Sequence, residues 1–193
     1  MFYRRIDEHL SLRLASPLDA EAMYAVVERN RDEFALWFGW AGPDFSLDAE
    51  REYLAQAVRN WAQFTELSTL IVLDGEVIGA VGLTHIDRVV RTCEIGYWLD
   101  AARRGTGIVT RAVREIETLA FEDLGLNRAS IHADVRNQAS RAVAERLGYQ
   151  WEGIMRGGLA GADHVPQDAA VYSLLRDEWL ARDGGGTVVE TTG

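Results

Sequence analysis

Residues 103–114 read RRGTGIVTRAVR, a stretch with four arginines, two glycines and no carboxylate. The chain of 193 residues carries a formal net charge of −10, so this stretch is a positive region in an acidic protein. From about residue 107 the apolar residues recur with helical spacing, which places the glycines at the start of a helix. The charge pattern fits an anionic ligand, and it equally fits a solvated helix face whose arginines pair with Glu115 and Glu117.

The two glycines give this loop a specific physical property. Gly105 and Gly107 let the backbone approach a ligand closely and point successive N–H groups at it. The first N–H groups of a helix have no intrahelical partner, and the helix dipole is positive there, so a diphosphate fits this place. A helix cap with a tight turn explains the same glycines. A Walker loop is excluded because no Gly-Lys-Ser/Thr is present, and Thr110 stands where a dinucleotide fingerprint needs its third glycine.

Two strands flank the loop and its helix along the chain. Residues 93–99 precede the loop, and residues 129–135 alternate polar and apolar side chains. Between them we expect a helix from about residue 107 to residue 123. A strand, a helix and a second strand in this order predict a right-handed crossover that joins two parallel strands.

The other strands are expected to be mostly antiparallel. Asp74-Gly75 lies between the apolar runs 67–73 and 77–83, and this pair predicts a tight hairpin because both turn residues need positive φ angles. We expect helices to start at Ser16, Ser46 and Asn137, and further strands at residues 10–14, 151–155 and 165–175. The expected order is β-α-α-β-β-β-α-β-α-β-β, which predicts a mixed α+β or α/β fold.

The length of the chain predicts a single domain over residues 1–182. Residues 183–193 contain three consecutive glycines and no core-forming pattern, so we expect a disordered C-terminal tail. With Cys93 as its one cysteine, the chain excludes an internal disulfide framework or cysteine metal cluster, and no histidine has metal-ligand spacing. We therefore expect a cytoplasmic protein without a metal.

The charge and hydropathy of the chain also bear on its partners. Nucleic-acid binding needs a basic face that displaces counterions, so a net charge of −10 argues against it. Because no apolar run of about 18 residues occurs, we expect no membrane association. An acidic chain fits a cationic or amine-bearing partner.

At this point the chain resembles a known family. The loop Arg104–Val109 is similar to the Q/R-x-x-G-x-G/A pyrophosphate loop of the GNAT acetyltransferases, although Val109 replaces the small last residue. The preceding strand Glu94-Ile-Gly-Tyr-Trp-Leu99 and the helix start Asn137-x-x-Ser140 resemble the RimJ/RimL branch, the ribosomal-protein N-terminal acetyltransferases. The resemblance covers roughly residues 10–176. It implies the GNAT fold: a mixed, mostly antiparallel sheet with a central splayed parallel strand pair and helices on both faces.

The resemblance also implies acetyl-CoA as co-substrate and places it. Its pantetheine would lie in the gap between the two splayed strands and bond the backbone near Trp98 and Leu99, and Asn137 and Ser140 would lie beside the thioester. The pyrophosphate would be held by the loop residues Arg104, Gly105, Thr106, Gly107, Ile108 and Val109.

Catalysis is predicted less directly. Many GNAT enzymes protonate the leaving thiolate with a tyrosine seven residues after the asparagine, and here Ala144 occupies that position. Ser140 is therefore our candidate for this role, beside its alternative role in supporting the helix cap. Some RimL-type enzymes use a glutamate as base, but Leu159 occupies the corresponding position. Glu94 and Asp168 remain as candidate bases, with His85 as a further one.

The acceptor is expected to be an amine near the aromatic segment Phe34–Phe45. Trp37, Phe38 and Trp40, together with His85, are the candidate acceptor-binding residues, and helix packing is the alternative role of the aromatics. An α-amine has a pKa of about 7.7–8.0 and a lysine amine one of about 10.4, so an enzyme without a strong base suits the α-amine.

These observations predict direct attack by a protein N-terminus, such as that of a ribosomal protein, on acetyl-CoA. A small amine (an antibiotic, polyamine or amino acid) and a non-catalytic acyl-CoA-binding module are the alternatives. Members of this branch are often dimers, so we expect a homodimer.

Overall fold

The described strands form one mixed sheet of eight strands. The computed structural model describes residues 2–161 and 165–182. The spatial order of the strands is β1-β2-β3-β4-β5-β6-β8-β7. The strands are β1 (Tyr3–Arg5), β2 (Leu10–Leu14), β3 (Leu67–Leu73), β4 (Glu76–Asp87), β5 (Thr92–Leu99), β6 (Arg128–Asp134), β7 (Gln150–Ala160) and β8 (Pro166–Leu175). Within this order β5 and β6 pair in parallel and the other neighbours pair antiparallel.

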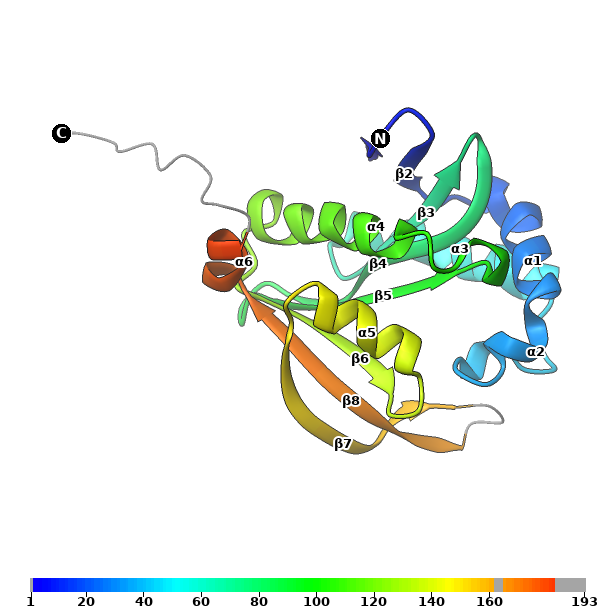
Figure 1. Cartoon of the computed structure of the whole chain (residues 1–193). Helices are drawn as coiled ribbons and strands as arrows, with labels where there is room; N and C mark the ends of the chain where they lie inside the picture. The colour runs from blue at the N-terminus through cyan, green and yellow to red at the C-terminus, as the bar shows by residue number, and fades with distance from the viewer. Residues whose placement is uncertain (1, 162–164, 183–193) are drawn as a thin grey trace.

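Helices cover both faces of the sheet (Figure 1). The α-helices are α1 (Ala20–Arg29), α2 (Arg31–Phe34), α3 (Leu47–Ala62), α4 (Ile108–Thr118), α5 (Gln138–Arg146) and α6 (Arg176–Arg182). On one face, α4 and α5 bury their apolar stripes against Ile78, Ile95 and Ile131. On the other face, α1 and α3 pack against Leu70 and Val72. The predicted layers and mixed sheet are confirmed.

The local signals in the sequence act as their chemistry predicts. Asp74 and Gly75 have φ angles of 50° and 84°, so the hairpin between β3 and β4 has the expected turn. Ser16 begins the first helical segment with a capping box completed by Asp19. The Ser46 side chain accepts a hydrogen bond from Ala49 N at the start of α3, and Asn137 caps α5 in the same way.

The elements that sequence patterns did not predict depend on tertiary pairing. The short strand β1 is polar and is held by β2, with Tyr3 opposite Arg13. β7 extends to Ala160 through Arg156, Gly157 and Gly158, which lack apolar alternation. The helix expected to end at residue 123 ends as α-helix at Thr118 and continues as one π-helical turn, Leu119–Asp123. α6 was not predicted, and the tail expected at residues 183–193 lies outside the described residues.

The central strand pair diverges. β5 and β6 pair only through Thr92 with Arg128, Cys93 with Ala129 and Glu94 with Ser130. Beyond this point β5 continues beside β4 as far as Leu99, and β6 continues beside β8 as far as Asp134. Residues 95–99 of β5 therefore have no strand partner on their β6 side within the described register. The predicted splay is confirmed, and it opens the sheet at its centre.

Candidate active site

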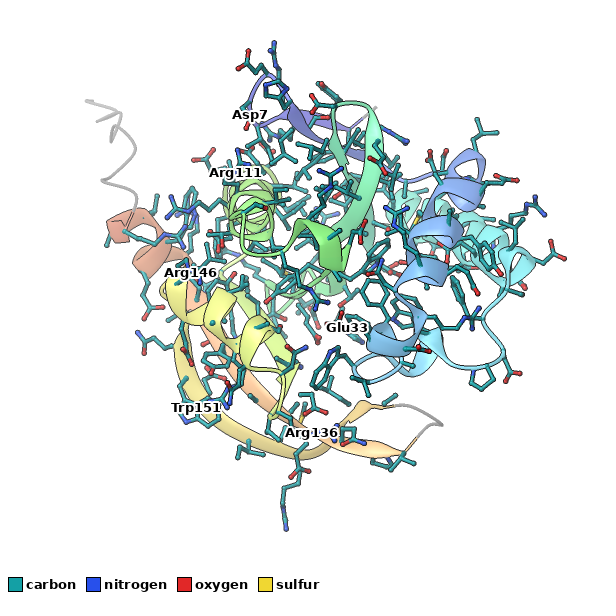
Figure 2. The ribbon with its side chains drawn as sticks, turned by 45° about the vertical axis from the view of Figure 1, so that its right-hand side comes forward. Asp7, Glu33, Arg111, Arg136, Arg146 and Trp151 are labelled. Carbon is teal, nitrogen blue, oxygen red and sulfur yellow. The ribbon has the colours of Figure 1, made fainter. Side chains whose placement is uncertain are left out.

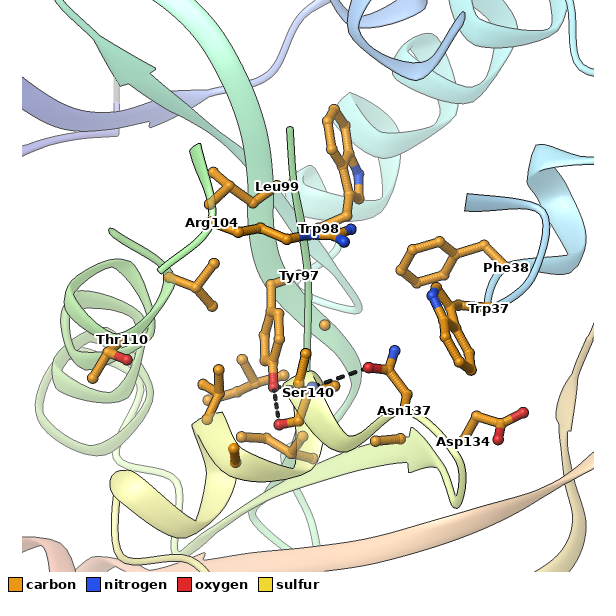
Figure 3. A pocket seen from close by; sticks show the side chains of 18 of the residues that line it. Trp37, Phe38, Tyr97, Trp98, Leu99, Arg104, Thr110, Asp134, Asn137 and Ser140 are labelled. Atoms are coloured by element: carbon orange, nitrogen blue, oxygen red, sulfur yellow. Dashed lines mark hydrogen bonds between the residues drawn. The ribbon is translucent and has the colours of Figure 1, made fainter. Parts of the chain in front are cut away.

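A cavity of about 1350 Å³ occupies the gap between the diverging strands (Figure 3). Its walls come from β5, β6, α4 and the loop before it, α5, the end of β7 and the aromatic segment after α2. Every residue predicted to bind the co-substrate lines this cavity: Trp98, Leu99, Arg104, Gly105, Thr106, Gly107, Ile108, Val109, Asn137 and Ser140.

The loop before α4 presents a row of free backbone donors. Gly105 and Gly107 have φ angles of 74° and 75°, which favour glycine, and Gly107 is the N-cap of α4. In the part of the chain that the structure describes, the amides of residues 105–110 have no hydrogen-bond acceptor, whereas Arg111 N bonds Gly107 O. These six N–H groups lie at the positive end of a helix dipole, where an anion is stabilised.

Arginines surround this end of the cavity. Five of them line it: Arg103, Arg104, Arg111, Arg114 and Arg146. Arg104 pairs with Glu33 of α2, and Arg111 pairs with Asp7. Figure 2 labels Glu33, Arg111, Asp7 and Arg146. Arg114 and Arg146 have no carboxylate within 4.0 Å among residues 2–161 and 165–182. The solvated-face alternative, in which the arginines pair with Glu115 and Glu117, does not describe the ion pairs present.

Two hydroxyl groups meet on the α4/α5 side of the gap. Tyr97 Oη lies 3.0 Å from Ser140 Oγ and donates to or accepts from it, and it lies 3.0 Å from Ser140 O (Figure 3). Asn137 Oδ1 accepts a hydrogen bond from Ser140 N at 3.1 Å, which fixes the first turn of α5. Burial raises the pKa of Tyr97 to about 12, so this hydroxyl keeps its proton at neutral pH.

A carboxylate and two imidazoles meet on the opposite side of the sheet. Glu94 Oε2 lies 3.2 Å from His132 Nδ1 and 3.6 Å from His85 Nδ1. Successive strand residues point to opposite faces, so Glu94 faces the α1/α3 side, whereas Ile95 and Tyr97 pack with the α4/α5 core. The gap therefore has a carboxylate with two imidazoles on one face and a pair of hydroxyl groups on the other.

The aromatic segment both packs and lines the cavity. Trp37, Phe38 and Trp40 are all in the cavity wall. Phe38 stacks on Trp40 at 5.2 Å between ring centroids, and the buried Phe34 packs edge-on against Trp98 at 5.5 Å. These aromatics therefore pack together and also line the cavity, and their role in acceptor binding stays a prediction.

Two predicted residues lie outside the cavity wall. Asp168 Oδ1 accepts a hydrogen bond from Gly157 N at 2.9 Å, where β8 faces β7. His85 is exposed at the end of β4 and contacts the site only through Glu94. Of the positions noted for their departure from related enzymes, Leu159 lines the cavity and Ala144 is fully buried.

Sequence reasoning singled out neither Tyr97 nor His132 as a site residue. Tyr97 carries a detectable signal, because strand alternation places it on the same face as Ile95 and therefore toward α5. His132 alternates with Ile131 and Ala133 and thus faces the side on which Glu94 lies. The pairing of Glu94 with His132 depends on the register of β5 and β6, which no local pattern gives.

Two further searches of residues 2–161 and 165–182 bear on other kinds of site. No group of three or more His, Cys, Asp or Glu side chains is arranged to hold a metal ion. None of the helices in this part of the chain has the length and apolar character required to cross a bilayer.

Comparison with known proteins agrees with the geometry. Residues 9–150 match the model of the acetyltransferase (GNAT) domain. A Bacillus subtilis (strain 168) protein named "Putative ribosomal N-acetyltransferase YdaF" is 38% identical over 180 residues, which are 93% of this chain and 98% of the relative.

Two solved structures share the fold. The microcin C7 self-immunity acetyltransferase MccE, in complex with acetyl-CoA and AMP, is 26% identical with a TM-score of 0.81, covering 88% of this chain and 94% of its own. RimL, a ribosomal L7/L12 α-N-protein acetyltransferase in complex with coenzyme A, is 24% identical with a TM-score of 0.85, covering 92% and 99%. The chain therefore belongs to the GNAT family of acetyl-CoA-dependent acetyltransferases, in its RimJ/RimL branch.

Proposed function

We propose that this protein acetylates the N-terminal α-amine of a protein, such as a ribosomal protein, by direct attack in a ternary complex. The observation that carries the proposal is the open gap between β5 and β6, with Glu94 and His132 on one face and Tyr97 and Ser140 on the other. The two proton transfers that amide formation requires thus have separate groups on opposite sides of one slot.

The residues at the α4 end fit the phosphates of acetyl-CoA. Among the described residues, the six amides of residues 105–110 have no acceptor, and Arg114 and Arg146 have no carboxylate partner. These groups offer donors and positive charge to a diphosphate. The unpaired edge of residues 95–99 offers backbone groups to pantetheine, as a neighbouring strand would. When bound there, acetyl-CoA supplies the activated acyl group.

On the acceptor side, Glu94 is proposed to take the proton of the attacking amine. Because an α-amine is already partly neutral at pH 7, a strong base is not needed to remove a proton from it. A carboxylate that acts directly or through water is sufficient. His132 Nδ1, at 3.2 Å from Glu94 Oε2, orients that carboxylate and stabilises its charge. Asp168, the other predicted base, is outside the cavity wall, and we place it in the β7–β8 pairing.

On the thiol side, Tyr97 and Ser140 are proposed to supply the proton for the leaving sulfur. A thiol has a pKa of about 8.5, far below that of a tyrosine hydroxyl held at about 12, so Tyr97 remains a hydrogen-bond donor at neutral pH. Donation to a developing thiolate stabilises that charge as it forms. Ser140 Oγ links the same hydroxyl to the start of α5 and shares the donation.

Thiol release from acetyl-CoA with two acceptor panels tests the proposal. The chain contains 20 arginines and no lysine, so its own amino terminus is the one primary amine that could give a background signal. We expect turnover with short peptides that have a free α-amine, and none with N-formylated peptides that contain an internal lysine. Turnover of polyamines or aminoglycosides alone would contradict the α-amine assignment, and tight acetyl-CoA binding without any turnover would indicate a non-catalytic module.

We further infer a homodimer built from single-domain protomers spanning residues 1–182, in the cytoplasm where ribosomal proteins are made. The edge strand β7 exposes the apolar side chains of Trp151, Ile154 and Met155, which supports a protein contact on this edge. Light scattering at micromolar protein concentration is expected to give twice the mass of 21.5 kDa.

A further inference from the structure

A second cavity, of about 740 Å³, lies on the acceptor side of the sheet between α1, α3 and the strands β3, β4 and β5. It adjoins the gap, because Gly96, Tyr97 and Trp98 of β5 and the segment Phe38–Trp40 line both cavities. An acceptor bound on this side of the gap therefore lies next to the second cavity. We call it the Glu50 pocket.

Glu50, in the first turns of α3, is a buried carboxyl group in this pocket. Only 4% of its surface is exposed, and its Oε1 atom has no hydrogen-bond partner among the described residues. The capping of α3 does not use Glu50, because Ser46 accepts the bond from Ala49 N. A buried carboxyl oxygen without a partner in an apolar wall is costly, so its presence here points to a ligand that satisfies it.

The rest of the wall defines the chemistry of that ligand. Apolar side chains such as Met23, Val27 and Phe45 form much of it, and the acidic residues Asp44 and Glu66 also line it. No arginine, lysine or histidine is among the described residues that line the pocket. Three carboxyl groups without a cation among apolar walls favour a positively charged group on an apolar stem.

We propose that the Glu50 pocket binds a second cationic group of the acceptor, carried on an alkyl stem, while the reacting amine lies in the gap. For a peptide acceptor, this is an arginine or lysine side chain at one of the first two positions. The location of the reacting amine rests on the proposed function, whereas the preference for a cation rests on the pocket alone. A small diamine or guanidino-amine has the same chemistry, so the test distinguishes the two sources.

Matched peptides isolate the charge. Peptides that carry arginine or its neutral isostere citrulline, at position 1 or 2, differ in the cation but not in size, and neither side chain is a substrate for acetylation. Of the two arginine peptides, we consider the one with the higher kcat/KM. We expect its kcat/KM to exceed that of the matching citrulline peptide by about 10–100-fold, the range for a hydrogen bond to a charged group. Agmatine against butylamine is the small-molecule arm.

Variants assign the preference to the pocket. Glu50→Gln removes the charge and keeps the shape, and we expect it to bring the arginine-to-citrulline ratio close to 1. Asp48→Asn is the matched control, because Asp48 is on the same helix but its side chain is 92% exposed, and we expect it to keep the wild-type ratio.

The wild-type ratio decides the proposal even if a variant does not fold. A ratio near or below 1 for both the peptide and the agmatine pairs would overturn the pocket assignment, as would an undiminished ratio in folded Glu50→Gln. Equal turnover of arginine and citrulline peptides, together with equal turnover of agmatine and butylamine, would leave α-amine acetylation intact while removing this inference. Preferred turnover of agmatine, without turnover of any peptide, would support the pocket and contradict the α-amine acceptor.

Discussion

The role proposed for the hydroxyl of Tyr97 is one that many GNAT enzymes give to a tyrosine at another position. Ala144 is where many GNAT enzymes have their tyrosine, and it is fully buried against the core. Tyr97 reaches the first turn of α5 from strand β5, with its hydroxyl 3.0 Å from Ser140 Oγ. A proton donor at one point in space can thus be supplied from a different element, and this is why a motif search centred on α5 misses it.

Replacing Tyr97 with phenylalanine tests this role at the level of one atom. We expect Tyr97→Phe to lower kcat by about 10²-fold, the lower range for loss of a general acid, with the Kd for acetyl-CoA little changed. Because the pKa of Tyr97 is about 12, the wild-type kcat should not fall through loss of this proton below about pH 10. An unchanged kcat in the variant would exclude Tyr97 from the chemical step.

Ser140→Ala provides the companion measurement at the same site. We expect turnover to fall more than acetyl-CoA binding, because Asn137 Oδ1 still accepts from the backbone N of residue 140 and keeps α5 capped. Circular dichroism checks the helix content, and steady-state kinetics gives kcat. Equal rates for the variant and the wild type would remove Ser140 from the mechanism.

Glu50 gives a stability prediction with a defined sign. Burial raises the pKa of Glu50 from 4.5 to about 7 in the folded chain. Between these pH values the folded state holds a proton that the unfolded state has lost, so the free energy of unfolding falls as the pH rises. The stability lost by ionising this buried carboxyl group is of order 3 kcal/mol. The full loss is present above pH 7, and none of it is present well below pH 4.5.

Glu50→Gln cannot ionise and should escape this penalty. Urea unfolding at each pH gives the difference in unfolding free energy between the variant and the wild type. We expect this difference to shift in favour of the variant by up to about 3 kcal/mol from pH 4 to pH 8. A stability difference that does not change between the two pH values would show that the carboxyl ionises freely in the folded protein.

At the scale of elements, the start of α4 is the feature that the sequence predicts best. The position of two glycines before an amphipathic helix was enough to predict the free amides, because this property is local. The Asp74-Gly75 hairpin was predictable for the same reason. β1, α6 and the second half of β7 were not predictable, because their residues are ordered by the strands and core they contact rather than by their own pattern.

The charge at the helix start can be varied separately from its geometry. Gly107 has a φ angle of 75°, and a Cβ built there meets open space, so both Asp and Asn replace it with the same backbone cost. We expect Gly107→Asp to raise the Kd for acetyl-CoA about 10-fold or more above that of Gly107→Asn, because only Asp places a negative charge against the diphosphate. Calorimetric titration of both variants gives the ratio, and equal affinities would defeat the assignment of this loop to phosphate binding.

At the scale of the whole molecule, the distribution of charge matters more for binding an anionic ligand than the net charge does. The chain has a net charge of −10, yet five arginines line one end of the main cavity. Three of them face carboxylates, namely Arg103, Arg104 and Arg111, and so are held in place before any ligand arrives. Arg114 and Arg146, which pair with no carboxylate of the described chain, supply the uncompensated positive charge.

Ionic strength and single charge removals test this distribution. We expect Arg114→Gln to raise the Kd for acetyl-CoA by about 3–10-fold at about 50 mM salt, and by less at about 500 mM, where screening is stronger. Arg156→Gln removes the same charge from β7, outside the cavity wall, and should leave the Kd unchanged. An equal effect of both substitutions would mean that net charge, rather than the arginines at the mouth, governs binding.

The site as a whole shows where sequence reasoning stops. That the residues predicted to bind the co-substrate line one cavity was foreseeable, because most of them follow one another in a loop and a strand. The base was left open among Glu94, Asp168 and His85, because their separation depends on how β5, β6 and β8 are arranged in the sheet. The Glu50 pocket had no signal at all, since Glu50 at the start of a helix has the pattern of an ordinary solvated acid.

The amide resonances of residues 105–110 test the central claim most directly. In ¹H–¹⁵N correlation spectra, we expect acetyl-CoA to move the Gly105 and Gly107 amide protons downfield, as hydrogen bonds to phosphate form, and acetyl-pantetheine, which lacks the diphosphate, to leave them in place. Saturated acetyl-CoA binding that leaves these amides unmoved would contradict the claim that the start of α4 holds the co-substrate.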